Sequence, residues 1–315
     1  MTLQPWLHAS WQQFSQQLAQ DRLGHAILVQ GAAGTGKLAL AEAMVARLLC
    51  TADGEFACGQ CRSCTLYAGG AHPDYMRLTP EEDKHVITVK QARALIANLA
   101  LTTSFSERKV ALIVPAEAMH KSAANALLKN LEEPPGHAFL ILVAHDASRL
   151  PVTIRSRCHA IAIHMPERQV AAGWLREQGV EAALAEAALD SAGGSPGTAL
   201  AFARAGLVEA HSRLLRGLDA LLGKPGRVSE LAGVVQGVHP ETVWTWLSHC
   251  SADAFRGAST GHNPAWLKSG LSLAPRGVAS LQRQADRNRM LAKTSVRQDL
   301  LLQEWLIEWA SLARQ

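Results

Sequence analysis

In the first half of the chain, short apolar runs alternate with segments in which apolar residues recur every three or four positions, as on one face of a helix. The apolar runs predict buried strands at residues 25–30, 109–114 and 139–143. Apolar residues at helical spacing predict helices at residues 11–19, 37–50, 87–99 and 122–131. Strands that alternate with helices are typical of a parallel sheet covered by helices on both faces. We therefore predict an α/β region here, with residues 72–86 as a linker between its modules.

The second half of the chain has only helical patterns. Helices are predicted at residues 170–178, 181–189, 207–222, 227–236, 241–255, 281–291 and 296–312, and one more begins at Pro196 with Ser195 as its N-cap. Segments rich in glycine or proline, such as 223–226 and 257–264, separate them. The predicted fold class is therefore α/β plus all-α.

Composition narrows the class of protein. The 315 residues are 48% hydrophobic and 18% charged, with a net charge of +4, which permits contact with nucleic acid without requiring it. No run of eighteen apolar residues occurs, and the first residues lack a basic region followed by an apolar core. We therefore expect a cytoplasmic protein without a membrane span.

Residues 27–40 read ILVQGAAGTGKLAL, a strand followed by a glycine turn and a helix. Gly31, Gly36 and Lys37 have the spacing GxxxxGK, with Gly34 between them, which suits backbone N–H groups and one ammonium to a polyphosphate. The next residue is Leu38, where a site that cleaves nucleotides has Ser or Thr to hold Mg²⁺. The loop is predicted to bind phosphate and not to cleave it.

The end of the strand at 109–114 also lacks the expected acids. A hydrolytic site has an Asp there to hold the water shell of the metal, but this chain has Val114 and Pro115. Glu117 is the nearest acid, and we interpret it as a solvated residue in the first turn of a helix. His145, after the strand at 139–143, is interpreted as a loop histidine.

Four cysteines, Cys50, Cys58, Cys61 and Cys64, cluster with the pattern Cx7Cx2Cx2C. Four thiolates at this spacing can close a tetrahedron around a structural Zn²⁺. An iron–sulfur cluster also suits the pattern, as does a redox pair of thiols, and colour separates the first of these from zinc. Because all four ligands come from the protein, a zinc site here has no open position for catalysis.

Several motifs together resemble the bacterial clamp-loader subunits of DNA polymerase III, within the AAA+ group. They are GAAGTGK, the cysteine cluster, KVALIV, NALLKNLEEPP and RLPVTIRSRC, and the resemblance is dense from about residue 5 to residue 205. It implies three domains: an AAA+ P-loop domain with a parallel sheet and a zinc module (1–163, module 50–64), a small helical lid (164–205) and a helical collar (206–315).

The family contains motor subunits and a non-motor class that has lost much of its nucleotide site. This chain departs from the motor pattern at Leu38, Val114, Pro115 and Gly197, the last where motors have a sensing Arg. The resemblance therefore implies the non-motor class, in which ATP binding through Gly31, Gly34, Gly36 and Lys37 is vestigial, weak or absent.

The arginine of the SRC motif is Arg157, and the resemblance implies that it reaches the ATP of the neighbouring subunit. There its planar guanidinium would stabilise charge on the transferred phosphoryl group. Ser156 is expected to orient the turn, and Cys158 is expected to lie in the core at the start of a strand. Implied partners are the motor subunits and the delta (wrench) subunit in a hetero-pentamer, and, through that complex, the sliding clamp and primer–template DNA.

Two other functions remain open. One is an active ATPase, a motor subunit with an unusual site, and the other is a DNA-binding or scaffold module whose phosphate loop is a relic. In the last helices, an apolar stripe formed by Leu302, Trp305, Leu306 and Trp309 fits the core of the domain better than a subunit contact. A basic cluster of Arg283, Arg287, Arg289, Lys293 and Arg297 is interpreted as a solvated or subunit-facing surface, with phosphate contact as the alternative.

Overall fold

The computed structural model describes residues 3–82, 84–222, 225–271, 273–292 and 294–312. Contacts divide the chain into two compact units. The first holds Met1–Trp174 with Ser195–Gly197, and the second holds Leu175–Gly194 with Thr198–Gln315. Among the described helices, none combines the length and apolar character needed to cross a bilayer.

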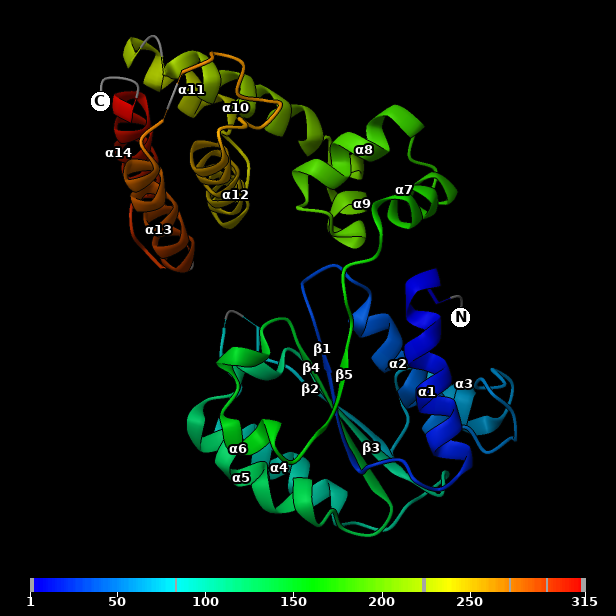
Figure 1. Ribbon diagram of the computed structural model, residues 1–315. Coiled ribbons are helices and arrows are strands. Elements are labelled where there is room, and N and C mark those ends of the chain that lie inside the picture. The colour runs from blue at the N-terminus through cyan, green and yellow to red at the C-terminus, as the bar shows by residue number, and fades with distance from the viewer. Residues whose placement is uncertain (1–2, 83, 223–224, 272, 293, 313–315) are drawn as a thin grey trace. The chain divides into compact units, whose positions relative to one another are not determined.

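A five-stranded parallel sheet organises the first unit, with strand order β2-β3-β4-β1-β5 (Figure 1). Its strands are β1 (Ala26–Gln30), β2 (Tyr75–Leu78), β3 (Lys109–Ile113), β4 (Ala138–Ala144) and β5 (His159–Ala162). In the register, Ile27 of β1 lies between Ile141 of β4 and His159 of β5. Because every pair is parallel, the carboxyl ends of all five strands meet at one edge of the sheet, and the amino ends meet at the other.

Helices cover both faces of this sheet. One face is covered by α1 (His8–Ala19) and α2 (Lys37–Leu49), and the other by α4 (Val89–Leu99), α5 (Lys121–Glu132) and α6 (Val152–Arg155). Alternate strand residues serve the two cores: Ile27 and Val29 of β1 face α2, whereas Ala26 and Leu28 belong to the opposite core. The predicted helices and buried strands of this unit are confirmed, with boundaries within a few residues.

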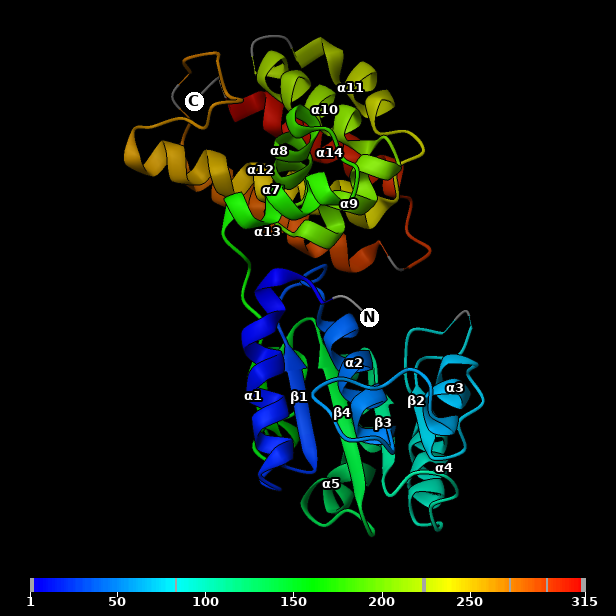
Figure 2. The same ribbon diagram turned by 90° about the vertical axis from the view of Figure 1, so that its right-hand side faces the viewer.

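The prediction for residues 72–86 was wrong. Residues 72–86 were interpreted as a linker, but they contain β2, which pairs with β3 at the edge of the sheet beside α4 (Figure 2). Nearby, α3 (Arg62–Ala68) contacts α2 and was also not predicted. The sequence of β2, YMRL, is short and has no apolar run, so its pairing depends on β3 and not on its own pattern.

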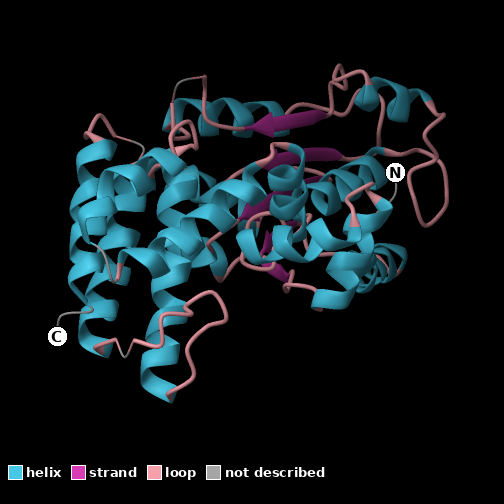
Figure 3. Cartoon of the chain, turned by 90° about the horizontal axis from the view of Figure 1, so that it is seen from above, coloured by secondary structure: helices cyan, strands magenta, loops and turns pink. Residues whose placement is uncertain are grey.

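The remaining regular elements are helical (cyan in Figure 3). They are α7 (Arg168–Glu177), α8 (Ala182–Ser191), α9 (Pro196–Arg204), α10 (Leu207–Leu221), α11 (Val228–Val234), α12 (Pro240–Thr260), α13 (Pro275–Leu291) and α14 (Gln298–Ser311). Short 3₁₀ helices occur at Pro5–Leu7, Ala116–Ala118, Ala147–Arg149 and Pro225–Arg227. All the predicted helices form, but α13 begins six residues earlier than predicted, at Pro275, because proline fits the first turn of a helix.

Tryptophans dominate the core of the second unit. Trp305 and Trp309 stack with ring centroids 5.4 Å apart, and Leu306 lies buried beside them. Both indole N–H groups have a partner: Trp305 donates to the carbonyl oxygen of Leu281, and Trp309 donates to that of Leu218. The apolar stripe on α14 therefore belongs to the core of its own domain, as predicted, with Leu302 half-buried at its margin.

Candidate functional site

The phosphate loop, residues 31–36, joins β1 to α2 at the carboxyl edge of the sheet. Gly31 has φ +149°, and a side chain there would place Cβ 2.2 Å from the carbonyl oxygen of Ile163. Gly36 has φ +84° directly before α2, a conformation that side chains avoid. The spacing of glycines that predicted a phosphate loop thus produces its expected turn, at the N-terminus of a helix of thirteen residues.

Four successive carbonyl oxygens of this loop accept hydrogen bonds from the chain itself. Ala32 accepts from Thr35 Oγ1 (2.9 Å) and Lys37 Nζ, Ala33 from Ser195 Oγ (2.8 Å), Gly34 from Gly197 N (2.8 Å), and Thr35 from Trp6 Nε1 (2.9 Å). The donors come from the N-terminal segment, from the loop region and from residues 195–197. The conformation of the loop is therefore held without any ligand.

Gly197 fits this contact because it has no side chain. A Cβ at this position would lie 2.7 Å from the carbonyl oxygen of Gly34, closer than such atoms approach. The position where motor subunits are expected to have a sensing Arg is thus in backbone contact with the phosphate loop. Restoring a large residue here would require the loop or residues 195–197 to move.

Lys37 is buried at the start of α2, with 2% of its surface exposed. Burial lowers the pKa of Lys37 to about 8, and the negative charge of Glu117 opposes that shift. Its ammonium is bonded to the carbonyl of Ala32 and lies 3.5 Å from Thr35 Oγ1. The lysine is held within the loop, where an anion would favour its charged form.

The oxygen ligands of a hydrolytic site are replaced by apolar groups. Leu38 packs partly buried against the core of β1 and α2, and Val114 is buried at the end of β3. Neither offers an oxygen to Mg²⁺. The geometry therefore agrees with a loop that lacks the means to hold the catalytic metal in the usual way.

The interpretation of Glu117 as a solvated residue was wrong. It lies in a 3₁₀ helix after β3, half-buried, and its Oε1 accepts hydrogen bonds from the backbone N–H groups of His145 (2.9 Å) and Asp146 (3.4 Å). Its Oε2 is buried and has no hydrogen-bond partner among the described residues. The carboxylate therefore belongs to the carboxyl edge of the sheet and acts electrostatically on Lys37.

Arg157 lies at the opposite edge of the sheet, between α6 and β5. It forms an ion pair with Glu132 of the NALLKNLEEPP motif, in which Nε and NH2 both lie 2.6 Å from Glu132 Oε1. Its NH1 donates to the carbonyl of Thr153 at 3.1 Å, and 32% of its side chain is exposed. Two of the recognised motifs thus meet at this ion pair.

The neighbours of Arg157 keep the turn in place. Ser156 Oγ donates to the carbonyl of Thr153 at 3.3 Å, within the same short helix. Cys158 is half-buried directly before β5 rather than fully in the core, and burial raises its pKa to about 11. A thiol with a raised pKa stays protonated at neutral pH and serves for packing.

The strand register separates Arg157 from the phosphate loop of its own chain. Arg157 lies two residues before His159, which pairs with Ile27, and the loop begins at Gly31, four residues after Ile27. The four residues from Ile27 to Gly31 span about 13 Å, and the turn that holds Arg157 lies beyond the other end of this stretch. Arg157 and Lys37 therefore do not share a site within one chain.

The four cysteines of the predicted metal site lie together, with all four sulfur atoms within 4.8 Å of one another. Backbone N–H groups point at three of the sulfurs: Cys58 N at Cys50 Sγ (3.4 Å), Cys61 N at Cys58 Sγ (3.3 Å) and Cys64 N at Cys61 Sγ (3.4 Å). Burial opposes ionisation of Cys61, but the N–H groups of Cys64 and Thr51 lower the pKa of its thiol to about 5. Four sulfurs at these distances, with N–H groups that favour thiolate, could bind a metal ion such as zinc.

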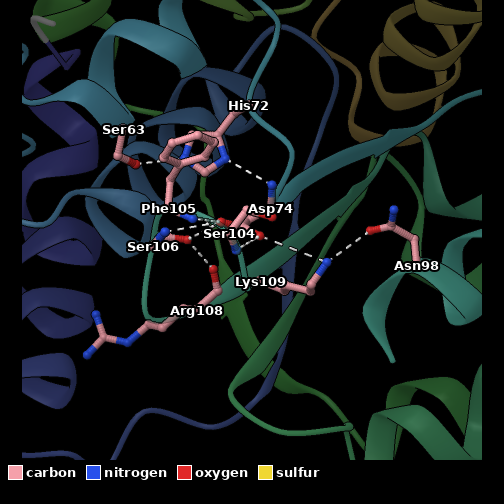
Figure 4. A network of polar contacts seen from close by, with 9 residues as sticks. All are labelled: Ser63, His72, Asp74, Asn98, Ser104, Phe105, Ser106, Arg108 and Lys109. Atoms are coloured by element: carbon pink, nitrogen blue, oxygen red, sulfur yellow. Dashed lines mark hydrogen bonds and ion pairs between the residues drawn. The ribbon is translucent and has the colours of Figure 1, made fainter. Parts of the chain in front are cut away.

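A buried polar network that the sequence analysis missed connects this module to the sheet (Figure 4). Asp74, just before β2, accepts hydrogen bonds from the backbone N–H groups of residues 104–106 at 2.8 to 3.1 Å, and from Ser106 Oγ at 3.2 Å. Buried Lys109 Nζ lies 3.9 Å from Asp74 Oδ1. Burial of Asp74 favours its neutral form, but these N–H groups outweigh that effect and lower the pKa of Asp74.

His72 continues the network toward the cysteines. Its Nδ1 accepts from the N–H of Asp74 (3.1 Å), and its Nε2 lies 2.7 Å from Ser63 Oγ, which donates to the carbonyl of Leu49 (2.6 Å). This pattern requires neutral His72 with its proton on Nε2. A histidine followed by proline and aspartate was the available signal in the sequence, but the N–H groups that Asp74 binds are 30 to 32 residues away along the chain.

Comparisons with known proteins show to which family the chain belongs. A family described as "DNA polymerase III, delta subunit" matches residues 6–167. DNA polymerase III subunit delta' of Pseudomonas aeruginosa is 37% identical over 98% of this chain and 97% of its own length, and that of Escherichia coli is 34% identical over 80% and 76%. A solved gamma subunit-related protein of Thermotoga maritima is 15% identical with a TM-score of 0.49, over 96% of this chain and 99% of its own. The chain belongs to the family of DNA polymerase III delta' subunits.

Proposed function

We propose that this chain is a non-hydrolysing clamp-loader subunit that supplies Arg157 to the ATP site of a neighbouring motor subunit. The observation that carries the proposal is the position of Arg157 in a turn at the amino edge of the sheet, beyond a stretch of strand of about 13 Å that separates it from the phosphate loop of the same chain. An arginine so placed can act on a phosphoryl group only when another protomer presents one. Membership of the delta' family, whose members are components of DNA polymerase III, supports such an assembly.

Within this proposal, Glu132 is a positioning residue. It binds Nε and NH2 of Arg157, which fixes the plane of the guanidinium and leaves NH1 on the carbonyl of Thr153. A polyphosphate from the next subunit competes for the same fork, because phosphate oxygens accept paired hydrogen bonds from arginine as carboxylates do. Ser156 keeps the turn that carries the arginine in shape. The partners are then the motor and delta subunits, with the sliding clamp and primed DNA reached through the complex.

The test is ATP turnover by the reconstituted complex with clamp and primed DNA. Arg157→Ala is expected to lower turnover at the adjoining site by about a thousandfold or more, as for other arginine fingers. Arg157→Lys keeps the charge but loses the fork, so it should recover little of that activity. Lys37→Ala, in the phosphate loop of the same chain, is the matched control and should change turnover less than twofold. Normal turnover with Arg157→Ala would overturn the trans role.

A second candidate function is an ATPase that uses its own site, and the position of Glu117 favours it. The carboxylate follows β3 at the carboxyl edge, with Oε2 buried and unpartnered among the described residues. The isolated chain would then hydrolyse ATP, and Glu117→Gln and Lys37→Ala would each abolish turnover. We expect no such activity, because Leu38 and Val114 still leave Mg²⁺ without its usual ligands.

For the cysteine cluster we propose a structural Zn²⁺ bound by Cys50, Cys58, Cys61 and Cys64. Zinc would hold the module closed, with no open coordination position. Metal analysis of the purified chain should give one zinc per chain and a colourless protein. Iron with brown colour would instead show the iron–sulfur alternative.

A further inference from the structure

One face of α13 carries a row of arginines in the second unit. Arg276, Arg283 and Arg287 are exposed, whereas Val278, Leu281 and Ala285 on the opposite side are buried. Positions separated by seven and four residues lie on the same side of a helix. We call Arg276, Arg283 and Arg287 the arginine stripe. Ser280 and Met290 are also exposed along this row.

The arginine stripe differs from the rest of its domain in how its charges are partnered. Residues 207–312 contain nine arginines. Six of them form ion pairs with carboxylates: Arg213, Arg216, Arg227, Arg256, Arg289 and Arg297. The other three are the stripe, which has no ion pair or hydrogen bond from its guanidinium groups to the described residues. Unpartnered arginines therefore gather on one face of one helix.

The acids near the stripe are occupied elsewhere. Asp286, the only acidic residue on α13, accepts a hydrogen bond from Ser248 Oγ of α12 (2.8 Å) and lies 3.7 Å from Arg289. Glu308 on α14 accepts from Gln284 at 3.3 Å. The positive charge of the stripe is thus left for a partner outside the domain.

The structure also divides the basic cluster that the sequence suggested. Arg289 and Arg297 are paired, and Lys293 lies outside the described residues. Arg276, which was not part of that cluster, joins Arg283 and Arg287 because α13 begins earlier than predicted. The exposed row of unpaired arginines therefore begins seven residues earlier than the original cluster and leaves out its paired members.

We propose that the arginine stripe binds the phosphate backbone of duplex DNA without reading its sequence. At 1.5 Å rise per residue, Arg283 and Arg287 lie about 6 Å apart along the helix, and Arg276 and Arg287 about 16 Å apart. A DNA strand advances about 3.4 Å per phosphate, so the row spans about five phosphates of one strand. Guanidinium groups bind phosphate oxygens in pairs, which suits backbone contact.

The surface fits duplex DNA better than single-stranded nucleic acid or a protein partner. Met290 is the one exposed large apolar residue on α13 among those described, so the row lacks the buried aromatic or aliphatic anchor of most protein interfaces. It carries no aromatic residue on which single-stranded bases could stack. By contrast, α14 exposes Leu300 and Ile307, a more suitable surface for a protein partner. The inference goes beyond the proposed function, since it needs neither ATP nor a neighbouring subunit.

The experiment measures binding of the purified full-length chain to a fluorescent 30-base-pair duplex by anisotropy, without nucleotide, from 25 to 200 mM KCl. We expect log K to fall with log salt with a slope of about −2 to −3, as for two or three phosphate contacts. Replacing the stripe with R276Q, R283Q and R287Q should weaken binding at least tenfold at 50 mM KCl. It should also bring the slope close to zero, because each phosphate contact contributes about one unit.

The matched control is the chain with R213Q, R216Q and R227Q. It removes the same charge from the same domain, but from arginines already paired with Glu209 and Glu230. Its affinity should change less than threefold, and circular dichroism should show that both variants are folded. An equal loss in the control, or no binding by the unaltered chain at 25 mM KCl, would overturn the proposal.

Two further probes distinguish the partner. Tighter binding of a single strand of the same length than of the duplex would contradict the duplex assignment. If polyglutamate bound as tightly as DNA and depended equally on the stripe, the surface would be one for acidic proteins, and the proposal would be wrong. Equal affinity for A·T-rich and G·C-rich duplexes is expected, because phosphate contacts carry no sequence information. None of these outcomes depends on Arg157 or on turnover by a complex.

Discussion

The polar cluster around Asp74 at the amino edge of the parallel sheet differs from the pair of Lys37 and Glu117 at the carboxyl edge in how fully its members are partnered. At the amino edge, Asp74 has hydrogen bonds to both carboxylate oxygens and a buried lysine nearby, and Arg157 is paired with Glu132. At the carboxyl edge, Lys37 is buried with a lowered pKa, and Glu117 keeps one buried oxygen unpartnered among the described residues. Buried polar groups usually find partners, so the free oxygen of Glu117 beside the buried Lys37 is unusual, although the described residues of the amino edge also include one such atom, His159 Nε2. The Asp74 cluster is therefore satisfied within the chain, whereas the pair of Lys37 and Glu117 is only partly satisfied.

The largest expected change in stability comes from a substitution of Asp74 at the amino edge. Asp74→Ala would leave Lys109 charged and buried, and three backbone N–H groups without their acceptor. We expect a loss of about 3 to 5 kcal/mol in the free energy of unfolding, as when one member of a buried pair is removed. Urea unfolding followed by circular dichroism measures it. The control is Glu117→Ala at the other edge, expected to cost less than about 1 kcal/mol because the N–H groups of His145 and Asp146 that it binds are exposed and can bond to water instead. Equal costs for the two substitutions would contradict the contrast between the two sites.

Lys37→Met at the carboxyl edge should increase the free energy of unfolding, in contrast to Asp74→Ala. The pKa of Lys37 is lowered by burial to about 8, so the folded state disfavours a charge that the unfolded chain carries freely. Its removal is expected to stabilise the fold by about 1 to 3 kcal/mol at pH 7, and the gain should shrink as pH rises from 8 toward 10.5, where the unfolded lysine also loses its proton. Stability measured at pH 7 and pH 10 tests this. Destabilisation at pH 7 would show that the lysine supports the loop more than its burial costs.

Gly197→Ala should disturb the loop, since the added Cβ would meet the carbonyl oxygen of Gly34 at 2.7 Å. A cost of about 1 to 2 kcal/mol is expected, in the range of other forced contacts. Gly233→Ala in α11 is the comparison, because its Cβ would meet nothing within 4 Å and helix propensity should yield about 0.5 to 1 kcal/mol of stabilisation. Thermal unfolding of the two variants should therefore move in opposite directions. Two shifts of the same sign would mean that the contact at residue 197 yields without strain.

The smallest expected effect is on the pH dependence of stability, through His72. Burial lowers the pKa of His72, and the N–H of Asp74 requires its Nδ1 to be unprotonated. The unfolded chain therefore takes up this proton first as pH falls below 6.5, and stability is lost from there down through the lower pKa of the folded state. We expect His72→Gln to remove about 1 kcal/mol or less of the difference in unfolding free energy between pH 7.5 and pH 5.5. An unchanged pH dependence in the variant would assign the effect to other groups.

Sequence patterns predicted the elements that carry their own signal. The strand before the phosphate loop, the helix that begins at Lys37 and the cysteine spacing are local, and all three form as predicted. The contacts that were missed join distant segments. Asp74 meets residues 104–106, and its meaning depends on β2, whose four residues show no periodicity of their own. Glu117 was misjudged for the same reason, because its partners follow the next strand of the sheet.

The sequence predicted where functional residues lie in the fold, but not which groups they contact. The motif around Arg157 indicated a turn, but the ion pair of Arg157 with Glu132 arises from packing between α5 and α6. The arginine stripe also required the structure, because charge counting alone does not separate paired from free guanidinium groups. The extent of α13 decided which arginines share a face.

The hydrogen bonds from outside the phosphate loop also limit how far the loop can change its conformation. Trp6, Ser195 and Gly197 hold three consecutive carbonyl oxygens from outside the loop, so its shape is set while the chain folds and not by the arrival of a substrate. In the proposed assembly, a subunit with such a loop would contribute a part of fixed shape. Hydrogen exchange at the amides of residues 32–35 should accordingly be the same whether or not the solution contains ATP.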